Sequence, residues 1–179
     1  MPDELRASPA VPVLDTGRLV LRGHRLDDFA DYVALWADPV VTRYIGGRPS
    51  SEEETWTRLL RGVGHWSLMG FGYWAIIEKA SGRFAGEVGF VDLKRSIQPS
   101  LAGAPENGWV LAPWAQGRGL ATEAVQAAID WGAPRFGERR MVCLIHPDNH
   151  ASLRVAEKCG YRERARTVYK GDPTLVLER

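Results

Sequence analysis

Residues 109–122 read Trp-Val-Leu-Ala-Pro-Trp-Ala-Gln-Gly-Arg-Gly-Leu-Ala-Thr, and this order of residues fits few backbone arrangements. The short apolar run breaks at Pro113, two glycines follow, and from Leu120 the apolar residues recur at helical spacing. The pattern therefore predicts a strand, a loop and a helix. We expect Gly132 and Pro134 to end that helix, because both residues disfavour a continuing helical backbone.

The start of this predicted helix is suited to binding an anion. The first turn of a helix has backbone N–H groups without partners inside the helix, and it carries the positive end of the helix dipole. Gly117 and Gly119 have no Cβ, so a phosphate can approach the main chain and the loop can adopt positive φ without strain. The segment predicts a site for a phosphorylated ligand.

Two common phosphate-binding loops match the segment poorly. A P-loop requires Lys followed by Ser or Thr after its last glycine, whereas Leu120 follows Gly119 here. A Rossmann fingerprint that begins at Gly117 would place its third small residue at Thr122, and no acidic residue ends the next predicted strand before Asp148. A Rossmann-type nucleotide-binding domain is therefore the less favoured alternative.

The segment resembles the acyl-CoA loop of the GNAT superfamily of N-acetyltransferases, (Gln/Arg)-x-x-Gly-x-(Gly/Ala), at Gln116, Gly119 and Ala121. Residues 146–161 agree, because His-Pro-Asp-Asn-His-Ala-Ser opens a helix that ends at Cys-Gly-Tyr, similar to the family's Asn-x-x-Ser helix and the turn after it. Residues 16–28 resemble the start of the branch that acetylates ribosomal-protein N-termini. The resemblance covers the chain from Thr16 to its last residue.

The resemblance implies an α/β (α+β) fold of GNAT type, with a mixed, mostly antiparallel central sheet flanked by helices. In the family the strand before the loop is bulged and splays from the following strand, which leaves a slot for pantetheine. At 179 residues the chain is long enough for one domain with its own core. We expect residues 1–15, rich in Pro and Ala, to be a flexible arm, and residues 16–179 to be a single GNAT domain.

The remaining patterns agree with a mixed sheet, since hairpin signals alternate with strand–helix–strand segments. An amphipathic helix is predicted from Leu26, ending before Pro39, and a second from Ser50 or Ser51 to about Leu68. A loop is expected at residues 94–105. Strands are expected at residues 18–22, 71–78, 83–93, 139–145, 161–169 and 174–177.

Composition excludes several classes of protein. A net charge of +1 gives no electrostatic footprint for nucleic acid, and no apolar run approaches the roughly 20 residues that span a bilayer. The N-terminus has no apolar core typical of a secretion signal, so a cytoplasmic protein is expected. Cys143 and Cys159 have no metal-site spacing and are expected to be buried thiols.

The charge is distributed unevenly along the chain. Residues 26–56 contain seven acidic and two basic residues, whereas residues 135–170 contain nine basic and four acidic residues. Two explanations are open. Both sets of charges lie on solvated helix faces, or the basic residues meet the phosphates of CoA while the acidic residues attract a cationic amine.

The resemblance also assigns residues to acetyl-CoA, the expected co-substrate. The amides of residues 117–122 hold the pyrophosphate, the Leu111 amide meets pantetheine, and the Trp109 amide contacts the acetyl carbonyl. Asn149 is a preferred N-cap residue, and in the family it also bonds the pantetheine arm. The expected cofactor-binding residues are Trp109, Leu111, Gln116, Gly117, Arg118, Gly119, Leu120, Ala121, Thr122, Asn149 and Ser152.

The catalytic residues are less well marked. Many family members carry a Tyr general acid seven residues after the Asn, but this chain has Ala156 there, so Ser152 or water inherits the role. Glu87 and Glu106 are the two candidates for a base that acts through a water, although strand glutamates commonly face solvent. The four histidines show no metal spacing, and no metal is expected.

We therefore expect an acetyltransferase that moves an acetyl group from acetyl-CoA to an amine by direct attack in a ternary complex. A weak base suffices for an α-amine, whose pKa of about 7.7–8.0 leaves more neutral amine at pH 7 than a lysine does. This favours a protein N-terminus or a small-molecule amine as acceptor, with the enzyme a monomer or homodimer and with no nucleic-acid or membrane partner. The alternative is a CoA-binding sensor or interaction module without turnover, which the missing Tyr suggests.

Overall fold

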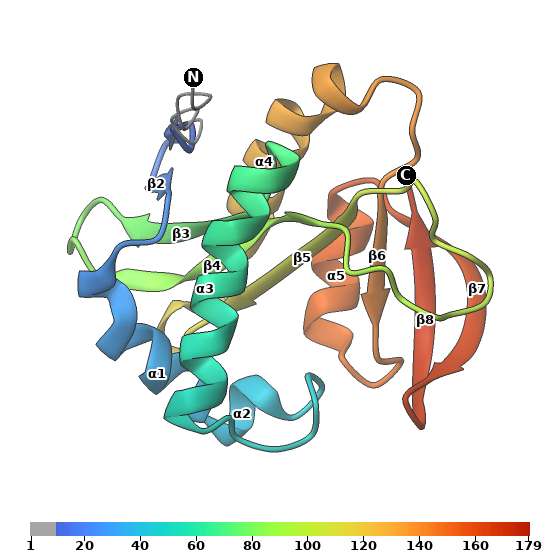
Figure 1. Ribbon diagram of the computed structural model, residues 1–179, viewed down its shortest axis with the longest axis horizontal. Helices are drawn as coiled ribbons and strands as arrows, with labels where there is room; N and C mark the ends of the chain where they lie inside the picture. Colours follow the sequence, from blue (N-terminus) through green and yellow to red (C-terminus); the bar gives the residue numbers. More distant parts are fainter. Residues whose placement is uncertain (1–9) are drawn as a thin grey trace, which may run out of the picture.

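The computed structural model describes residues 10–179, which form one eight-stranded sheet with helices on both faces (Figure 1). The strand order is β1-β2-β3-β4-β5-β6-β8-β7, and all neighbouring pairs are antiparallel except β5 and β6. The mixed, mostly antiparallel sheet that the sequence predicts is confirmed. The same topology excludes the Rossmann-type alternative, which requires a mostly parallel sheet.

The expected elements occur in the predicted order, and two short elements, β1 and α2, were not predicted. The strands are β1 (Leu14–Asp15), β2 (Leu19–Arg22), β3 (Tyr73–Glu78), β4 (Phe84–Val91), β5 (Glu106–Leu111), β6 (Val142–Ile145), β7 (Arg162–Tyr169) and β8 (Asp172–Glu178). The helices are α1 (Phe29–Ala37), α2 (Pro39–Thr42), α3 (Glu52–Met69), α4 (Leu120–Phe136) and α5 (His150–Lys158). Among the described residues, no helix combines the length and apolar character needed to cross a membrane.

Local capping explains where the helices before the central strands begin. Ser51 accepts a hydrogen bond from the Glu54 amide, and the Glu54 carboxylate accepts one from the Ser51 amide, so α3 starts with a capping box. The Asp38 carboxylate caps α2 by accepting hydrogen bonds from the Val40 and Val41 amides, with Pro39 at the first helical position. The predicted helix ends are also correct to within two residues, since α1 ends at Ala37, before Pro39, and α3 ends at Met69.

The predicted end of α4 is wrong. The helix continues through Gly132 and Pro134 to Phe136 and ends at Gly137. Pro134 removes only one backbone donor near the helix end, whereas Phe136 is buried against Phe90 and Trp131 in edge-to-face contacts. Tertiary packing of this aromatic side chain therefore outweighs the local preference of proline.

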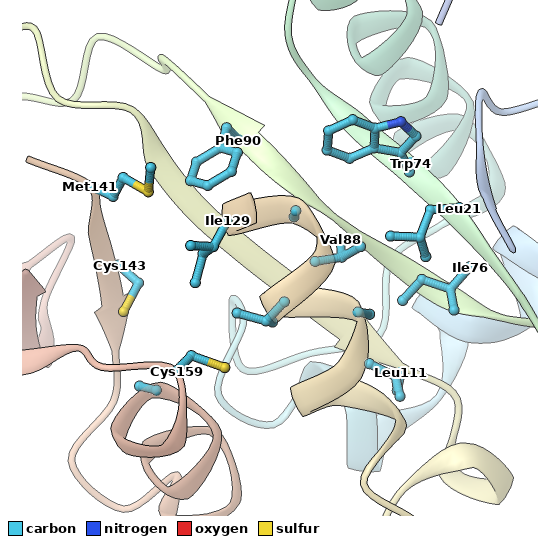
Figure 2. Close-up of a cluster of buried hydrophobic side chains, with 14 of the residues drawn as sticks. Leu21, Trp74, Ile76, Val88, Phe90, Leu111, Ile129, Met141, Cys143 and Cys159 are labelled. Carbon is cyan, nitrogen blue, oxygen red and sulfur yellow. The ribbon is translucent and has the colours of Figure 1, made fainter. Parts of the chain in front are cut away.

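Two layers of side chains cover the sheet. Figure 2 shows Leu21, Trp74, Ile76, Val88 and Phe90 on the face that packs against α4, where Ile129 meets them. The opposite face is covered by α1, α2 and α3 near β3–β5 and by the loop of residues 92–105 near β6 and β8 (Figure 1).

The strand pair β5–β6 diverges from one end. Glu106 and Val142 are paired in parallel register, and no other residue pair connects these two strands in the described chain. The splayed pair is thus confirmed, but the expected bulge in β5 is not present, because β5 pairs with β4 in unbroken register from Glu106 to Leu111. Register shifts occur elsewhere: Ala85 of β4 is the extra residue opposite the Ile76–Ile77 step of β3, and a second shift lies between Glu163 and Ala165 of β7. The splay comes from the short β5–β6 pairing alone.

The expected flexible arm lies partly outside the described residues, since nothing is described before residue 10. Leu14 and Asp15, which we expected in the arm, pair with Leu21 and Val20 as β1. The Trp74 indole also donates a hydrogen bond to the Pro12 carbonyl, 2.8 Å away. The end of the arm therefore belongs to the sheet.

Candidate active site

A large cavity of about 470 Å³ opens where β5 and β6 diverge, and we call it the large cavity. Four segments line it: residues 40–45 in and after α2, residues 109–111 of β5, the loop and first turn of α4, and α5 with its cap. The expected cofactor-binding residues that line it are Trp109, Leu111, Gln116, Gly117, Gly119, Leu120, Ala121, Thr122, Asn149 and Ser152. The sequence motifs, far apart in the chain, are thus brought together.

Two backbone amides of β5 point into the opening. Antiparallel strands alternate between residues that bond across the pair and residues whose N–H groups point away from it. The Ala112 amide donates to the Ala85 carbonyl, and the regular register makes residues 106, 108 and 110 the bonded ones. The N–H groups of Trp109 and Leu111 therefore face the edge that β6 leaves open.

The first turn of α4 also faces the large cavity. Its N-cap residue, Gly119, has φ +77° and provides no side-chain hydrogen bond to the helix. The amides of Leu120, Ala121 and Thr122 consequently lack intrahelical partners, and all three residues line the cavity. This arrangement presents several N–H donors and the positive end of a helix dipole to an anion.

Side chains from residues 16–18 form hydrogen bonds with the loop before α4 and with the first turn of α4. Arg18 donates to the Arg118 carbonyl at 2.8 Å and to the Glu123 carboxylate at 2.7 Å, and the Thr16 hydroxyl also donates to Glu123. The Arg118 side chain donates to Glu78, and Arg118 is the one expected cofactor-binding residue that is not among those lining the large cavity. The motif at residues 16–22 thus fixes the shape of the loop.

Gln116 has a structural contact of its own. Its side-chain amide donates to the Leu111 carbonyl at 2.9 Å. Because this carbonyl points the same way as the Leu111 N–H, the contact supports the orientation of the open edge. The Gln116 side chain therefore stabilises the end of β5 beside the large cavity.

Helix α5 supplies the other wall. The Asn149 side-chain oxygen accepts a hydrogen bond from the Ser152 amide at 3.2 Å, so the predicted N-cap is present. Ala156 is fully buried and leaves no hydroxyl where many family members have Tyr. The charged residues that line the large cavity are all cationic, namely Arg43, Arg154 and Lys158.

The two glutamates expected as bases have different surroundings, and neither lines the large cavity. Both oxygens of the Glu106 carboxylate accept hydrogen bonds from Arg95, at 2.6 and 2.7 Å. Glu106 therefore forms a structural ion pair through both carboxylate oxygens, which argues against the base role expected for it.

Glu87 lies in a buried polar cluster that the sequence does not reveal. One of its oxygens accepts a hydrogen bond from the Tyr32 hydroxyl at 2.9 Å and lies 3.3 Å from the His24 ring nitrogen Nε2. Burial, followed by the charge of Glu87, raises the pKa of Tyr32, so that its hydroxyl stays a donor. These side chains, with Arg58 and Tyr73, line a second cavity of about 20 Å³, the small cavity.

Neither cysteine is suited to act as a nucleophile. Cys143 and Cys159 are both buried and free, and burial raises the pKa of each thiol. A protonated, buried thiol is unreactive. Within residues 10–179 no group of three or more His, Cys, Asp or Glu side chains is placed to hold a metal ion.

The acidic segment has a largely structural explanation. Asp28 pairs with Arg22, Asp38 caps α2, and Glu54 pairs with Arg48 and closes the capping box of α3. None of the seven acidic residues of the segment is among those that line the two cavities. The idea that this segment attracts a cationic amine therefore has no support in the cavity walls.

The chain is similar to one protein-family model and to several known proteins. The model described as "Acetyltransferase (GNAT) domain" matches residues 18–162. The uncharacterized protein YkkB of Bacillus subtilis is 33% identical over 155 residues, covering 81% of each chain.

Two solved structures are also similar. A GnaT-family protein from Bordetella pertussis has a TM-score of 0.82 and 34% identity, with 94% of this chain and 99% of that one covered. RimL, a ribosomal-protein alpha-N-acetyltransferase in complex with coenzyme A, has a TM-score of 0.74 at 20% identity, with 94% and 97% covered. At 20% identity, the likeness to RimL shows a similar fold and no more.

Proposed function

The chain belongs to the GNAT acetyltransferase family, and from this membership and the site we propose that it transfers an acetyl group from acetyl-CoA to an amine. The observation that carries the proposal is the pair of amides at Trp109 and Leu111, which face an opening that ends at the N-terminus of α4. Acetyl-CoA supplies an activated thioester, a long polar arm and phosphates, and this cavity offers each a matching group.

The residues have separate roles in this proposal. The amides of Leu120, Ala121 and Thr122 bind the pyrophosphate, and the Leu111 amide binds the arm. The Trp109 amide donates a hydrogen bond to the acetyl carbonyl, which polarises it for attack. Arg154 and Lys158 add positive charge along the wall that faces these amides. Ser152 lies at the start of α5 and lines the large cavity, and in this proposal it gives a proton to the departing thiolate.

We propose direct attack by the amine without an acetyl-enzyme. Both thiols are buried and held protonated, so neither is available to form a thioester. Glu87 is the base, because its second carboxylate oxygen has no hydrogen-bond partner among residues 10–179, whereas Glu106 is fully engaged. Holding two reactants in one site supplies much of the acceleration, so few side chains are essential.

For the acceptor we propose an α-amine, either of a peptide N-terminus or of a small molecule. No carboxylate lines the large cavity, which disfavours polycationic amines. The likeness to RimL, a ribosomal-protein alpha-N-acetyltransferase, makes an N-terminal peptide the first acceptor to test.

A CoA-binding module without turnover is the second candidate, because Ala156 leaves the position of the usual general acid without a hydroxyl. Thiol release separates the two proposals. Purified protein is mixed with acetyl-CoA and a panel of N-terminal peptides, small amines and polyamines, and free CoA is measured.

Amine-dependent release supports the enzyme, with mass spectrometry expected to show no acetyl adduct on Cys143 or Cys159. Tight CoA binding without release on any amine supports the binding module. A rapidly formed adduct that amines discharge would contradict direct attack.

A further inference from the structure

The hydroxyl of Tyr73 reaches across the sheet to the strand that lines the large cavity. Tyr73 of β3 is paired with Gly89 of β4, and Gly89 is paired with Gly108 of β5, so the three residues form one cross-strand row. A Cβ on Gly108 would overlap the Tyr73 hydroxyl oxygen. The hydroxyl thus lies against the backbone of β5, one residue before Trp109.

This hydroxyl has no hydrogen-bond partner among the described residues. The neighbouring rows on the same face carry Glu87 and Glu106, one on each side of Tyr73. Burial, followed by the charges of Glu106 and Glu87, raises the pKa of Tyr73 above its ordinary value. The phenol therefore keeps its proton, and it is a hydrogen-bond donor that has no acceptor among residues 10–179.

The small cavity provides room for the missing acceptor. Its volume of about 20 Å³ exceeds the roughly 10–15 Å³ that one water requires. Tyr73, Glu87 and His24 all line it, and both ring nitrogens of His24 are buried without hydrogen bonds among residues 10–179. A single water here has enough polar partners to be retained.

The small cavity also adjoins the large one. Glu87 lines the small cavity, and Val110, its paired residue on β5, lines the large cavity. Paired residues on neighbouring strands share one face of the sheet and lie about 5 Å apart. The candidate base on β4 is therefore directly paired with a β5 residue that lines the cavity where the amine attacks.

We propose that Tyr73 is a positioning residue for acetyl transfer, whose hydroxyl donates a hydrogen bond to the water that carries the amine proton to Glu87. The inference rests on the proposed function. As the amine nitrogen forms its bond to the acetyl carbon, the carbon–sulfur bond breaks and the nitrogen gives a proton to the water. The water passes a proton to the Glu87 carboxylate, and the thiolate receives a proton from Ser152 or solvent.

The test is Tyr73→Phe, which removes the hydroxyl and keeps the ring. We expect kcat to fall about 10- to 100-fold, the cost of misplacing a reacting group, while KM for acetyl-CoA and the melting temperature stay unchanged. Tyr161→Phe is the matched control, because the Tyr161 hydroxyl likewise has no partner among the described residues but is buried in the main core. Its kcat should equal that of the parent.

Gly108→Ala gives a second, independent test. The added methyl displaces the Tyr73 hydroxyl, so it should lower kcat and stability in the parent. In the Tyr73→Phe background the nearest ring atoms lie 3.1 and 3.3 Å from the added carbon, so the methyl should be better tolerated and should cause little further loss of kcat. This non-additivity identifies the hydroxyl as the shared cause.

Each outcome decides between the proposals. A Tyr73→Phe enzyme with the parent's kcat, or with a raised KM alone, overturns the inference and leaves the proposed function standing. A parent that releases no CoA with any amine overturns the proposed function, and the inference falls with it.

Discussion

The large and small cavities differ in the groups that they offer to a ligand, which are backbone amides in the first and side chains in the second. The large cavity offers backbone amides from β5 and from the first turn of α4, and its charged side chains are all cationic. The small cavity is built from the side chains of His24, Tyr32, Arg58, Tyr73 and Glu87, which come from five separate segments. A backbone site depends on strand and helix geometry, whereas a side-chain site depends on a few particular residues.

The comparison predicts that substitutions in the small cavity change turnover without changing binding. Glu87→Gln removes the proposed base, and we expect kcat to fall about 10²- to 10⁴-fold with little change in affinity for acetyl-CoA. Glu106→Gln weakens the pair with Arg95, so it should lower the melting temperature and leave kcat close to that of the parent. A larger loss of kcat in Glu106→Gln would reverse the roles of the two carboxylates.

In the large cavity the backbone should dominate. Gly119→Glu brings a negative charge and a side chain to a position with φ +77°, where phosphate is expected. We expect affinity for CoA, measured by calorimetry, to fall by about 100-fold or more. Gly82→Glu, at φ +67° in the β3–β4 turn, is the control for backbone strain, and it should leave affinity unchanged. Equal affinity in both variants places the phosphate elsewhere.

Asn149→Ala tests whether one side chain of the large cavity serves both structure and ligand. Loss of the cap should cost about 1 kcal/mol of stability, and loss of a bond to the pantetheine arm should weaken affinity about fivefold. Ser51→Ala removes the cap of α3, away from the cavity, and should cost similar stability at no cost in affinity. An Asn149→Ala protein with unaltered affinity makes Asn149 a cap only.

The smallest effect concerns the segment that carries His24 and Tyr32. Burial opposes ionisation of Asp28, but hydrogen bonds from Arg22 and the Arg25 amide outweigh it and hold the pKa of Asp28 below its usual value. The pair therefore stabilises the fold above about pH 4, and this contribution is lost as pH falls through the folded pKa.

The corresponding variant is Asp28→Asn. It should melt below the parent at pH 7, and the gap should close on acidification; melting curves from pH 7 to pH 2 measure it. Asp27→Asn, at the exposed neighbouring carboxylate, should show no such gap. A pH-independent gap for Asp28→Asn would mean that the ion pair does not cause it.

The same contrast explains what the sequence can and cannot predict. Gly119, Asn149 and the apolar run before Pro113 act locally, so their spacing predicts the strand, the loop and both helix starts. Helix α4 passes Pro134 because Phe136 packs against residues that are remote in sequence, and no local rule contains that contact.

The polar cluster could not be predicted for a similar reason. His24 and Tyr32 come together with Glu87 only through the packing of α1 on the sheet, and their spacing in the chain carries no signal. The sequence does not reveal Arg18 and Glu123 as supports of the loop before α4, although Arg18 lies in the segment 16–28 that resembles the start of a family branch.

The short pairing between β5 and β6 has a further consequence for solubility. An unpaired strand edge is a template for another protein strand and a common start of aggregation. Here the unpaired stretch consists of Trp109 and Leu111, whose N–H groups are about 7 Å apart, and the Gln116 side-chain amide donates to the Leu111 carbonyl. With α5 and α2 on either side, the edge admits a slender chain of atoms and is too short to nucleate a β-sheet with a second molecule.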